Sequence, residues 1–308
     1  MAPSSPLRIG TRGSPLALAQ ARQVRDALAK AHGWPAEAVE IAAIRTSGDR
    51  IQDRPLAEAG GKGLFTKEIE QALIDGAIDL AVHSAKDMPT ALPDGLLLAA
   101  CLERGDVRDV FISRKAADLR ALPAGSVVAT ASLRRQAQVR RLRPDLRVTN
   151  IRGNVETRLR KIDEGLADAT LLALAGLDRL GLAHAATAIL SIEEFLPAVG
   201  QGVIAIETRA NDAHVLDLLA PIDHADTATA LAAERAFLAV LDGSCRTPIA
   251  GHAEVSGPSV QFRGMILRPD GSEWHETAAA GARGDAAALG AEAGRELKRR
   301  APLDFFAG

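Results

Sequence analysis

The sequence is poor in aromatic residues, cysteines and net charge, and each shortage excludes a class of protein. Aromatic residues make up 3% of the chain and tyrosine is absent, which argues against a surface that stacks single-stranded nucleic-acid bases. The two cysteines, Cys101 and Cys245, lie far apart, so neither a zinc site nor a disulfide framework is indicated. The net charge of −2 gives no sign of a general polyanion binder, and we expect no nucleic-acid partner.

The sequence also shows no segment that would enter or cross a membrane. No apolar run is long enough to span a bilayer, and the start, Met1–Arg8, has no apolar segment of a signal peptide. Apolar residues make up 47% and charged residues 25%, which is ordinary for a globular protein. We therefore expect a protein of the reducing cytoplasm. Its 308 residues are long for one domain and short for more than three.

Strand and helix patterns alternate in the N-terminal third, which is typical of an α/β domain with a parallel sheet. Leu7–Thr11 reads as a strand, and Ser14 with Pro15 offers a helix N-cap and a first helical residue. A helix is expected over Leu64–Asp75, with Gly76 directly after its end. The other expected strands of this domain are 39–45, 78–83 and 96–102.

The same alternation repeats in the middle of the chain and changes near the C-terminus. Ser132 and Asn154 each stand at a helix start, and Thr227 is expected to cap a helix that runs to Leu241. The expected strands of this part are 127–130, 146–151, 169–174, 197–207, 250–255, 260–267 and 274–280, and a last helix is expected over 285–300.

These patterns predict an α/β fold of three domains. Two α/β domains joined by crossover strands have the layout of periplasmic-type solute receptors, and ligands of such proteins bind in the cleft between the domains. A smaller α+β domain with an antiparallel sheet follows at the C-terminus. The glycine-hinged strand 197–207 is expected to return into the first domain. The predicted boundaries are 1–102 with 201–222, then 103–200, and then 223–308.

A cation and a carboxylate stand side by side where one predicted strand ends. Lys86 and Asp87 follow the strand 78–83 and precede Met88-Pro89, and the residue before a proline resists helix. Open α/β sheets bind their ligands at such strand ends. A solvated ion pair in a turn is the alternative, so this pair indicates a site only together with other residues.

Arginines recur at the predicted strand ends. Arg12 lies between the first strand and a helix N-terminus, where a cation and backbone N–H groups can share an anion. The ends of parallel strands meet at one edge of a sheet, so we expect the others to converge. Each could also be a solvated charge at a helix end, but together they predict a cleft for several carboxylates or phosphates. The arginines of the middle segment are Arg134, Arg135, Arg152, Arg158 and Arg179.

Two loops carry residues with reactive potential. Residues 46–63 show little periodicity, and we expect 47–62 to form a mobile lid, since loops of this length are usually functional or disordered. The run Gly60-Gly61-Lys62-Gly63 lacks the Ser or Thr that a nucleotide-binding phosphate loop needs after its lysine. Cys245 stands in a Gly/Ser loop beside Arg246, which favours a thiolate. Cys101, inside an apolar strand, is expected in the core.

Taken together, eight short motifs closely resemble the hydroxymethylbilane synthase family, also called porphobilinogen deaminases. Any one motif is weak evidence, but their order along the chain makes the resemblance specific from about residue 7 to residue 250. The motifs are Thr11–Leu18, Gly60–Phe65, Val82–Pro89, Ser132–Gln136, Arg152–Asn154, Ala175–Gly181, Leu196–Gly202 and Gly243–Cys245.

The resemblance implies a transferase of tetrapyrrole synthesis. Such an enzyme joins four porphobilinogen molecules head to tail, with loss of ammonia, and releases linear hydroxymethylbilane. Its primer is a dipyrromethane cofactor, held by a thioether to the cysteine that matches Cys245. Each pyrrole carries an acetate and a propionate, and the arginines would bind these carboxylates. The resemblance further implies a monomer that hands its product to the next enzyme of the pathway, and no metal.

The resemblance also assigns roles to single residues. Asp87 is implied as the catalytic carboxylate, which holds pyrrole N–H groups and stabilises the positive charge that forms as ammonia leaves. Glu58 stands where relatives carry a lysine, so we expect ion pairs within the lid at that position. Contacts to the cofactor are implied for Ser84, Lys86, Thr130, Ser132, Arg134, Arg135 and Arg152. Contacts to the substrate are implied for Arg12, Ser14, Lys62, Phe65, Arg158, Arg179 and Gln201.

A small-anion receptor of the periplasmic type, or a regulatory domain related to one, is the competing interpretation. Its layout of two α/β domains is the same. Such a receptor would need no fixed thiol and, if exported, would carry a signal peptide. Cys245 and the start of the chain therefore favour the synthase.

Overall fold

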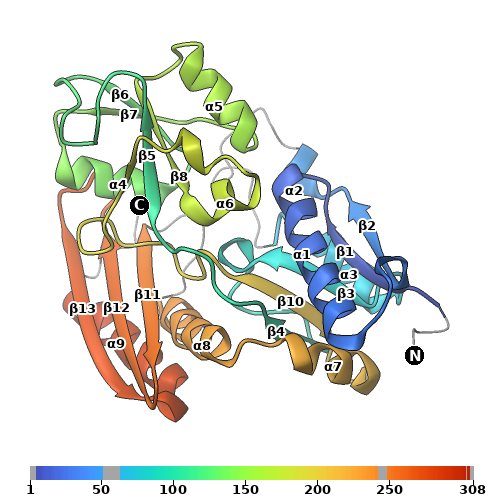
Figure 1. Cartoon of the computed structure of the whole chain (residues 1–308). Helices are drawn as coiled ribbons and strands as arrows, with labels where there is room; N and C mark the ends of the chain where they lie inside the picture. The colour runs from blue at the N-terminus through green and yellow to red at the C-terminus, as the bar shows by residue number, and fades with distance from the viewer. Residues whose placement is uncertain (1–4, 51–62, 242–247, 303, 306–308) are drawn as a thin grey trace. The chain divides into compact units, whose positions relative to one another are not determined.

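The computed structural model of the chain describes residues 5–50, 63–241, 248–302 and 304–305 (Figure 1). Within these ranges the chain forms two compact units, each built on β-sheet with helices packed against it. The first unit comprises residues 5–50, 63–105 and 202–228, and the second comprises 106–201 and the described residues from 229 onward.

The first unit is an α/β domain with a five-stranded sheet. Its strands lie in the order β2 (Val39–Ile44), β1 (Leu7–Arg12), β3 (Leu80–Ser84), β10 (Ile204–Arg209) and β4 (Leu96–Cys101). The predicted strands are thus present, but the sheet is mixed rather than parallel. β1 runs parallel to β2 and β3, whereas the returning strand β10 runs antiparallel to β3 and β4.

Local sequence signals explain the helices of this unit. The Ser14 hydroxyl accepts a hydrogen bond from the Ala17 N–H at 3.3 Å and Pro15 is the first helical residue, so the predicted start of the long helix is confirmed. Val24 and Leu28 of this helix are completely buried in the core. Each such burial stabilises the fold by roughly 1.5–3 kcal/mol. The helices are α1 (Pro15–His32), α2 (Ser47–Arg50), α3 (Lys67–Ile74) and α7 (Ala213–Leu219).

The second unit contains another five-stranded mixed sheet. Its order is β7 (Arg147–Thr149), β6 (Val127–Ala129), β8 (Ala169–Ala173), β5 (Asp109–Ser113) and β9 (Ala188–Ile189). β6 runs parallel to β7 and β8, so these three strands end at the same edge. The side chains of Ser132 and Asn154 cap the helices that follow β6 and β7, as predicted. The helices are α4 (Leu133–Leu142), α5 (Val155–Asp163) and α6 (Leu174–Arg179).

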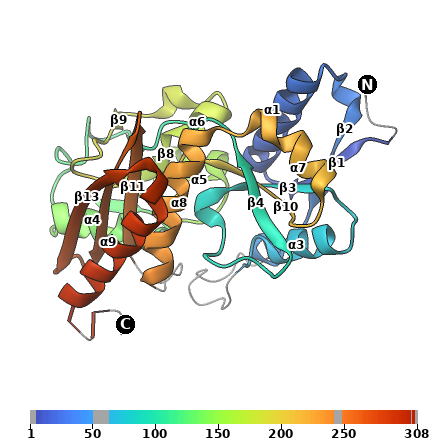
Figure 2. The same cartoon turned by 90° about the horizontal axis from the view of Figure 1, so that it is seen from below.

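A three-stranded antiparallel sheet completes the second unit. It consists of β11 (Ile249–Ser256), β12 (Ser259–Leu267) and β13 (Trp274–Ala282), in that order. The helices α8 (Ala225–Val240) and α9 (Ala286–Arg300) share its core, and Figure 2 shows α9 alongside the strands. Phe237 of α8 packs on Phe262 of β12 with ring centroids 4.9 Å apart. The predicted α/β class with an α+β C-terminal part is confirmed, and the three-domain boundaries stay a prediction.

The expected helix cap at Thr227 is wrong. α8 begins at Ala225, so Thr227 lies inside the first turn. His224 serves that turn instead: its Nδ1 accepts the N–H of Thr227 at 3.3 Å, and its carbonyl accepts the N–H of Ala228 at 3.0 Å. An imidazole can accept a backbone N–H as a hydroxyl does, but the usual capping pattern favours Ser, Thr, Asp and Asn.

Hydropathy gives no sign of a membrane-spanning helix. Within the described ranges, no helix is both long enough and apolar enough to cross a bilayer.

The close packing of α8 and α9 gives a test of the C-terminal core. A Cβ on Gly290 would lie 1.9 Å from the carbonyl oxygen of Ala233, so the helices must move apart to accept it. We predict that Gly290→Ala lowers the free energy of unfolding by roughly 1–3 kcal/mol in urea titrations. Gly284→Ala is the control, because nothing lies within 4 Å of its Cβ. Equal urea midpoints for the two variants would contradict this packing.

Candidate active site

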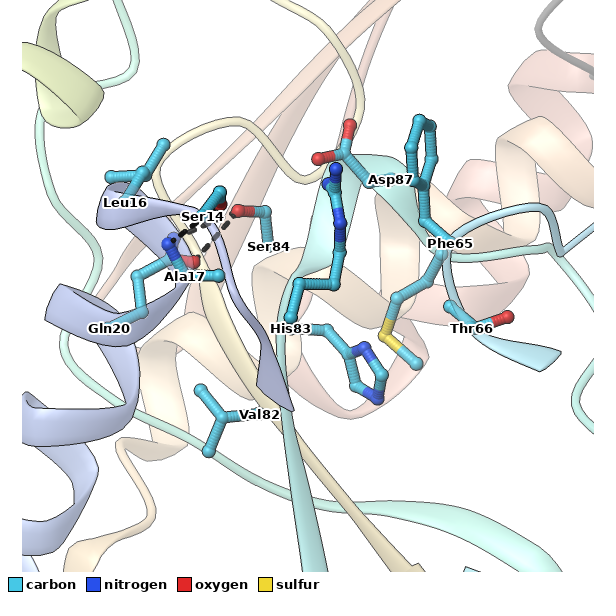
Figure 3. Close-up of a pocket in the computed structure, with 12 residues that line it drawn as sticks. Ser14, Leu16, Ala17, Gln20, Phe65, Thr66, Val82, His83, Ser84 and Asp87 are labelled. Carbon is cyan, nitrogen blue, oxygen red and sulfur yellow. Dashed lines mark hydrogen bonds between the residues drawn. The ribbon is translucent and has the colours of Figure 1, made fainter. Parts of the chain in front are cut away.

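One pocket in the first unit gathers several of the predicted site residues (Figure 3). It is an open hollow of about 430 Å³, placed where the parallel strands β1 and β3 end and where α1 begins. Five predicted residues share it, namely Arg12, Ser14, Phe65, Ser84 and Asp87. The remaining lining residues are Leu16, Ala17, Gln20, Thr66, Val82, His83 and Met88.

Arg12 stands at one wall of this pocket and is held by an aromatic ring. Its guanidinium carbon lies 4.0 Å from the centroid of Phe65, a cation–π contact that stabilises by roughly 0.5–2 kcal/mol. Phe65 comes from the segment that precedes α3, so two distant parts of the sequence fix this cation. Ser14 uses an oxygen lone pair to cap α1, and its hydroxyl hydrogen remains available to donate to a bound carboxylate.

Asp87 is presented to the pocket by an anchored turn. It ends the 3₁₀ turn η2 (Ala85–Asp87), directly after β3, and both Asp87 and Lys86 are exposed. The Ala85 N–H donates to the carbonyl of Val203, the residue just before β10, at 3.1 Å. On the other side of the turn, the Ser84 hydroxyl and the Gln20 amide exchange hydrogen bonds of 2.9 and 3.0 Å. The carboxylate is therefore solvent-accessible while its backbone is fixed.

A buried acid–base group lies behind the same pocket. Nε2 of His83 is 3.0 Å from Oε2 of Glu207, and the two side chains are 4% and 0% exposed. Glu70 of α3 is also buried. Burial raises the pKa of Glu70, the Thr66 hydroxyl opposes that shift, and the negative charge of Glu207 adds to it. The pKa of Glu70 therefore lies above the ordinary value of a glutamate.

In the second unit, a buried carboxylate pairs with two predicted site arginines. Asp109 opens β5 and is fully buried. Nη2 of Arg134 lies 2.8 Å from its Oδ2, and Nη2 of Arg135 lies 2.6 Å from its Oδ1. The Gln201 amide donates to Oδ1 at 2.9 Å. Burial alone would raise the pKa of Asp109, but the two guanidinium groups hold that pKa far below its usual range.

The two arginines have most of their donors committed inside the protein. Each is 5% exposed, and they also donate to the carbonyls of Leu196 at 2.7 Å and Leu171 at 3.0 Å. Nε of Arg134 is buried without a hydrogen-bond partner in the described part of the chain. Two cations against the one carboxylate of Asp109 leave this group with an excess positive charge.

The other predicted residues of this unit follow strands that end at one edge. Thr130 and Ser132 come after β6, Arg152 and Arg158 come after β7, and Arg179 ends the short helix after β8. Ser132 accepts the Arg135 N–H at 3.4 Å, and Arg158 Nε donates to the carbonyl of Gly153 at 2.9 Å. Burial lowers the pKa of Arg179, and its neighbour Asp178 opposes that shift.

Three predicted residues lie outside the described residues, namely Lys62, Glu58 and the cofactor-bearing Cys245. The predicted lid, 47–62, is described only in its first residues, which form α2. The Ser47 N–H donates to Glu68 of α3 at 2.8 Å, and the Ser47 hydroxyl contacts the same carboxylate oxygen. Cys101 is buried in β4, where a core role was expected.

Sequence reasoning missed several residues of these two groups, above all Asp109, His83 and Glu207. Each stands in a short apolar strand at a position that faces the interior. A titratable residue in an apolar strand is a usable signal, because a buried charge needs a partner. The pattern does not name that partner, since the contact spans 124 residues between His83 and Glu207.

The residues fit a small molecule with several carboxylates. The excess positive charge beside Asp109, the unpartnered Nε of Arg134 and the arginines along the edge of β6, β7 and β8 all favour anions. Asp87 supplies the opposite charge in the pocket of the first unit. Taken by itself, the second unit is thus an α/β domain whose strand edge is suited to anions.

Comparison with known proteins makes the class specific. The model of the porphobilinogen deaminase dipyrromethane-cofactor-binding domain matches residues 7–217, and that of the porphobilinogen deaminase C-terminal domain matches residues 228–299. The curated porphobilinogen deaminases of Nitrobacter winogradskyi and Nitrobacter hamburgensis are each 64% identical over 298 residues, which is 97% of this chain and 94% of theirs. The chain belongs to the porphobilinogen deaminase family.

Solved structures show a more distant likeness. Immunogenic lipoprotein A from Vibrio vulnificus is 12% identical with a TM-score of 0.44, over 72% of this chain and 97% of that one. A periplasmic substrate-binding protein of an ABC transporter from Coxiella burnetii is 14% identical with a TM-score of 0.43, over 70% of this chain and 91% of that one. At these scores the likeness carries no argument about function.

The buried ion pairs of Asp109 give a stability prediction. Asp109→Asn would leave Arg134 and Arg135 buried without a countercharge, so we expect a loss of roughly 3–5 kcal/mol of unfolding free energy. Asp145→Asn is the control, because the pair of Asp145 with Arg143 is solvent-exposed on the Asp145 side, and it should cost far less than Asp109→Asn. Similar losses in chemical denaturation would contradict the assignment.

The same group predicts a pH dependence. The folded-state pKa of Asp109 is depressed, so its ion pairs stabilise the fold above the unfolded carboxyl pKa of about 4. That contribution is lost as pH falls through the folded pKa. The stability advantage of the wild type over Asp109→Asn should therefore be constant from neutral pH to about pH 5 and shrink below that.

Proposed function

We propose that Asp87 and the arginine-bearing strand edge carry out, in this chain, the reaction of its family. The chain is a transferase of tetrapyrrole synthesis with hydroxymethylbilane synthase activity. It joins four porphobilinogen molecules head to tail, releases ammonia at each coupling, and frees linear hydroxymethylbilane by hydrolysis. The position of Asp87 in a pocket with Arg12 and Ser14 is the observation that supports the assignment of residues.

Asp87 has the position that a charge-stabilising carboxylate requires. Porphobilinogen becomes cationic at its reacting carbon as ammonia leaves, and a fixed negative charge lowers the free energy of that transition state. Asp87 is exposed to the pocket, and the bonds of Ser84 and Ala85 fix its turn, so little reorganisation is needed. Lys86 at the same turn suits a substrate acetate or propionate.

The arginines suit the acids of a growing chain of pyrroles. Each added pyrrole brings an acetate and a propionate, so the number of carboxylates rises with every coupling. Arg134 and Arg135 are anchored by Asp109, which supports a role early in assembly, at the cofactor. Arg158 and Arg179 stand on separate helices, which supports contacts to later rings. Ser132, Thr130, Arg152 and Gln201 complete the expected binding set.

The cofactor of the family is a dipyrromethane, which supplies the pyrrole carbon to which the first porphobilinogen is joined. The cation-rich edge of the second unit fits its carboxylates, with Arg134, Arg135 and Arg152 as the residues that would hold it. We assign its attachment to Cys245, because the other cysteine, Cys101, is buried in β4.

Porphobilinogen is the substrate, and the receptor interpretation is not favoured, since family membership extends over nearly the whole chain. A monomeric state, a cytoplasmic location and handover of the product to the next enzyme remain proposals, taken from the resemblance and the composition. Lys62 and the segment 47–62 remain proposed as a lid that excludes water, the competing nucleophile.

The role of Asp87 predicts a large kinetic effect. Asp87→Asn keeps the shape but removes the charge, so kcat for porphobilinogen consumption should fall by roughly 10²-fold or more. Asp94→Asn is the control, because Asp94 is an exposed carboxylate of the same unit that does not line the pocket. Turnover by Asp87→Asn at the Asp94→Asn rate would show that another group carries the chemistry.

The attachment site predicts a mass. Purified wild-type protein should weigh two pyrrole units more than its sequence and should colour with an aldehyde reagent for pyrroles. Cys245→Ser should have the unmodified mass and lower thermal stability, since a group bound only to the folded state stabilises it. Cys101→Ser should keep the added mass. An added mass on Cys245→Ser would place the thioether elsewhere.

A further inference from the structure

A second titratable side chain lines the pocket of Asp87. His83 is at the end of β3, just before the turn that carries Asp87, and Figure 3 shows both among the lining side chains. In the sheet, His83 of β3 lies opposite Ala205 of β10, and Glu207 stands two positions after Ala205 on β10. Side chains two positions apart share a face, so the imidazole and the carboxylate meet beneath the pocket.

The contact with Glu207 decides which ring nitrogen carries the proton. A carboxylate oxygen only accepts, so with Glu207 ionised Nε2 of His83 donates to Oε2 of Glu207 across their 3.0 Å. In the neutral ring, Nδ1 is then the basic nitrogen. A carboxylate that orients an imidazole in this way is the arrangement of general acid–base catalysts.

The charges around the ring favour this arrangement. Glu70 faces it from α3, and burial, with the nearby charge of Glu207, raises the pKa of Glu70. Oε1 of Glu70 and Oε1 of Glu207 are buried without hydrogen-bond partners in the described part of the chain. Arg12 and Asp87 border the pocket beyond the ring.

We infer that Nδ1 of His83, with the ring oriented by Glu207, moves a proton at each coupling; this rests on the proposed function. Coupling forms a carbon–carbon bond and breaks the carbon–nitrogen bond of the aminomethyl group, whose electron pair leaves with ammonia. The pyrrole carbon that gains the new bond loses its proton, and the electron pair of that C–H bond returns to the ring. Nδ1 accepts this proton and passes it to ammonia, which departs as ammonium.

The first test uses the resting enzyme and does not depend on turnover. Nitrogen-15 NMR of the histidine-labelled protein at pH 8 should show His83 with a protonated Nε2 and a bare Nδ1. The signal is assigned by its absence in His83→Gln. Glu207→Gln should shift it, because the charged acceptor is gone. A His83 ring with its proton on Nδ1 would overturn the inference.

The second test is kinetic. Glutamine can still donate to Glu207 but cannot take up a proton, so His83→Gln should lower kcat by roughly 10²-fold or more and change KM less than about threefold. The matched control is His275→Gln. The Nε2 of His275 is also 3.0 Å from a carboxylate, that of Glu273, but His275 belongs to β13 of the second unit and is not among the residues that line the pocket. This control should keep the wild-type kcat. Equal kcat for the two variants would overturn the inference.

Chemical rescue separates proton transfer from a structural role. Added imidazole should restore part of the kcat of His83→Ala, because a small base can occupy the space, whereas it should not change the kcat of Asp87→Asn. Absence of rescue in a folded His83→Ala, checked by circular dichroism, would overturn the inference. If the variants of His83 do not fold, the NMR tautomer of the wild type decides. A wild type without turnover would instead overturn the proposed function.

Discussion

The buried ion group of Asp109, Arg134 and Arg135 is the constraint on which much of the second unit depends. An unpaired charge in a protein interior costs several kcal/mol, so none of the three can be removed alone without a large loss. Their contacts also tie β5, α4 and β8 together, because Arg135 donates to the carbonyl of Leu171. Gln201 donates to the same carboxylate, so the segment that leads to β10 is fixed at the same point.

The first unit also buries a group of titratable side chains, but in this group carboxyls outnumber basic side chains. His83 and Glu207 form its buried pair, and Glu70 adds a second carboxyl. This group is rich in acid, whereas the group around Asp109 is rich in cations.

The turn that carries Asp87 is more exposed than the residues that hold it in place. Asp87 and Lys86 are exposed on a turn, where they can meet a ligand, whereas the residues that fix them are buried or partly buried. The Ser84 and Gln20 pair and the main chain of Ala85 keep this turn in place. A charge held ready in this way stabilises a transition state without first rearranging the protein.

Most strands, most helix starts and the placement of arginines at strand ends could be predicted from the sequence, but the strands β5 (Asp109–Ser113) and β9 (Ala188–Ile189) were missed. These features depend on neighbours along the chain, as in the cap of α1 by Ser14, and the order of short motifs indicated the family. That Arg134 and Arg135 both pair with Asp109, and that His83 contacts Glu207, became visible only in the tertiary structure. Arg135 and Asp109 lie 26 residues apart in the sequence, and His83 and Glu207 lie 124 residues apart. A titratable residue in an apolar strand indicates that a buried partner must exist, but which residue becomes that partner depends on how the strands pack.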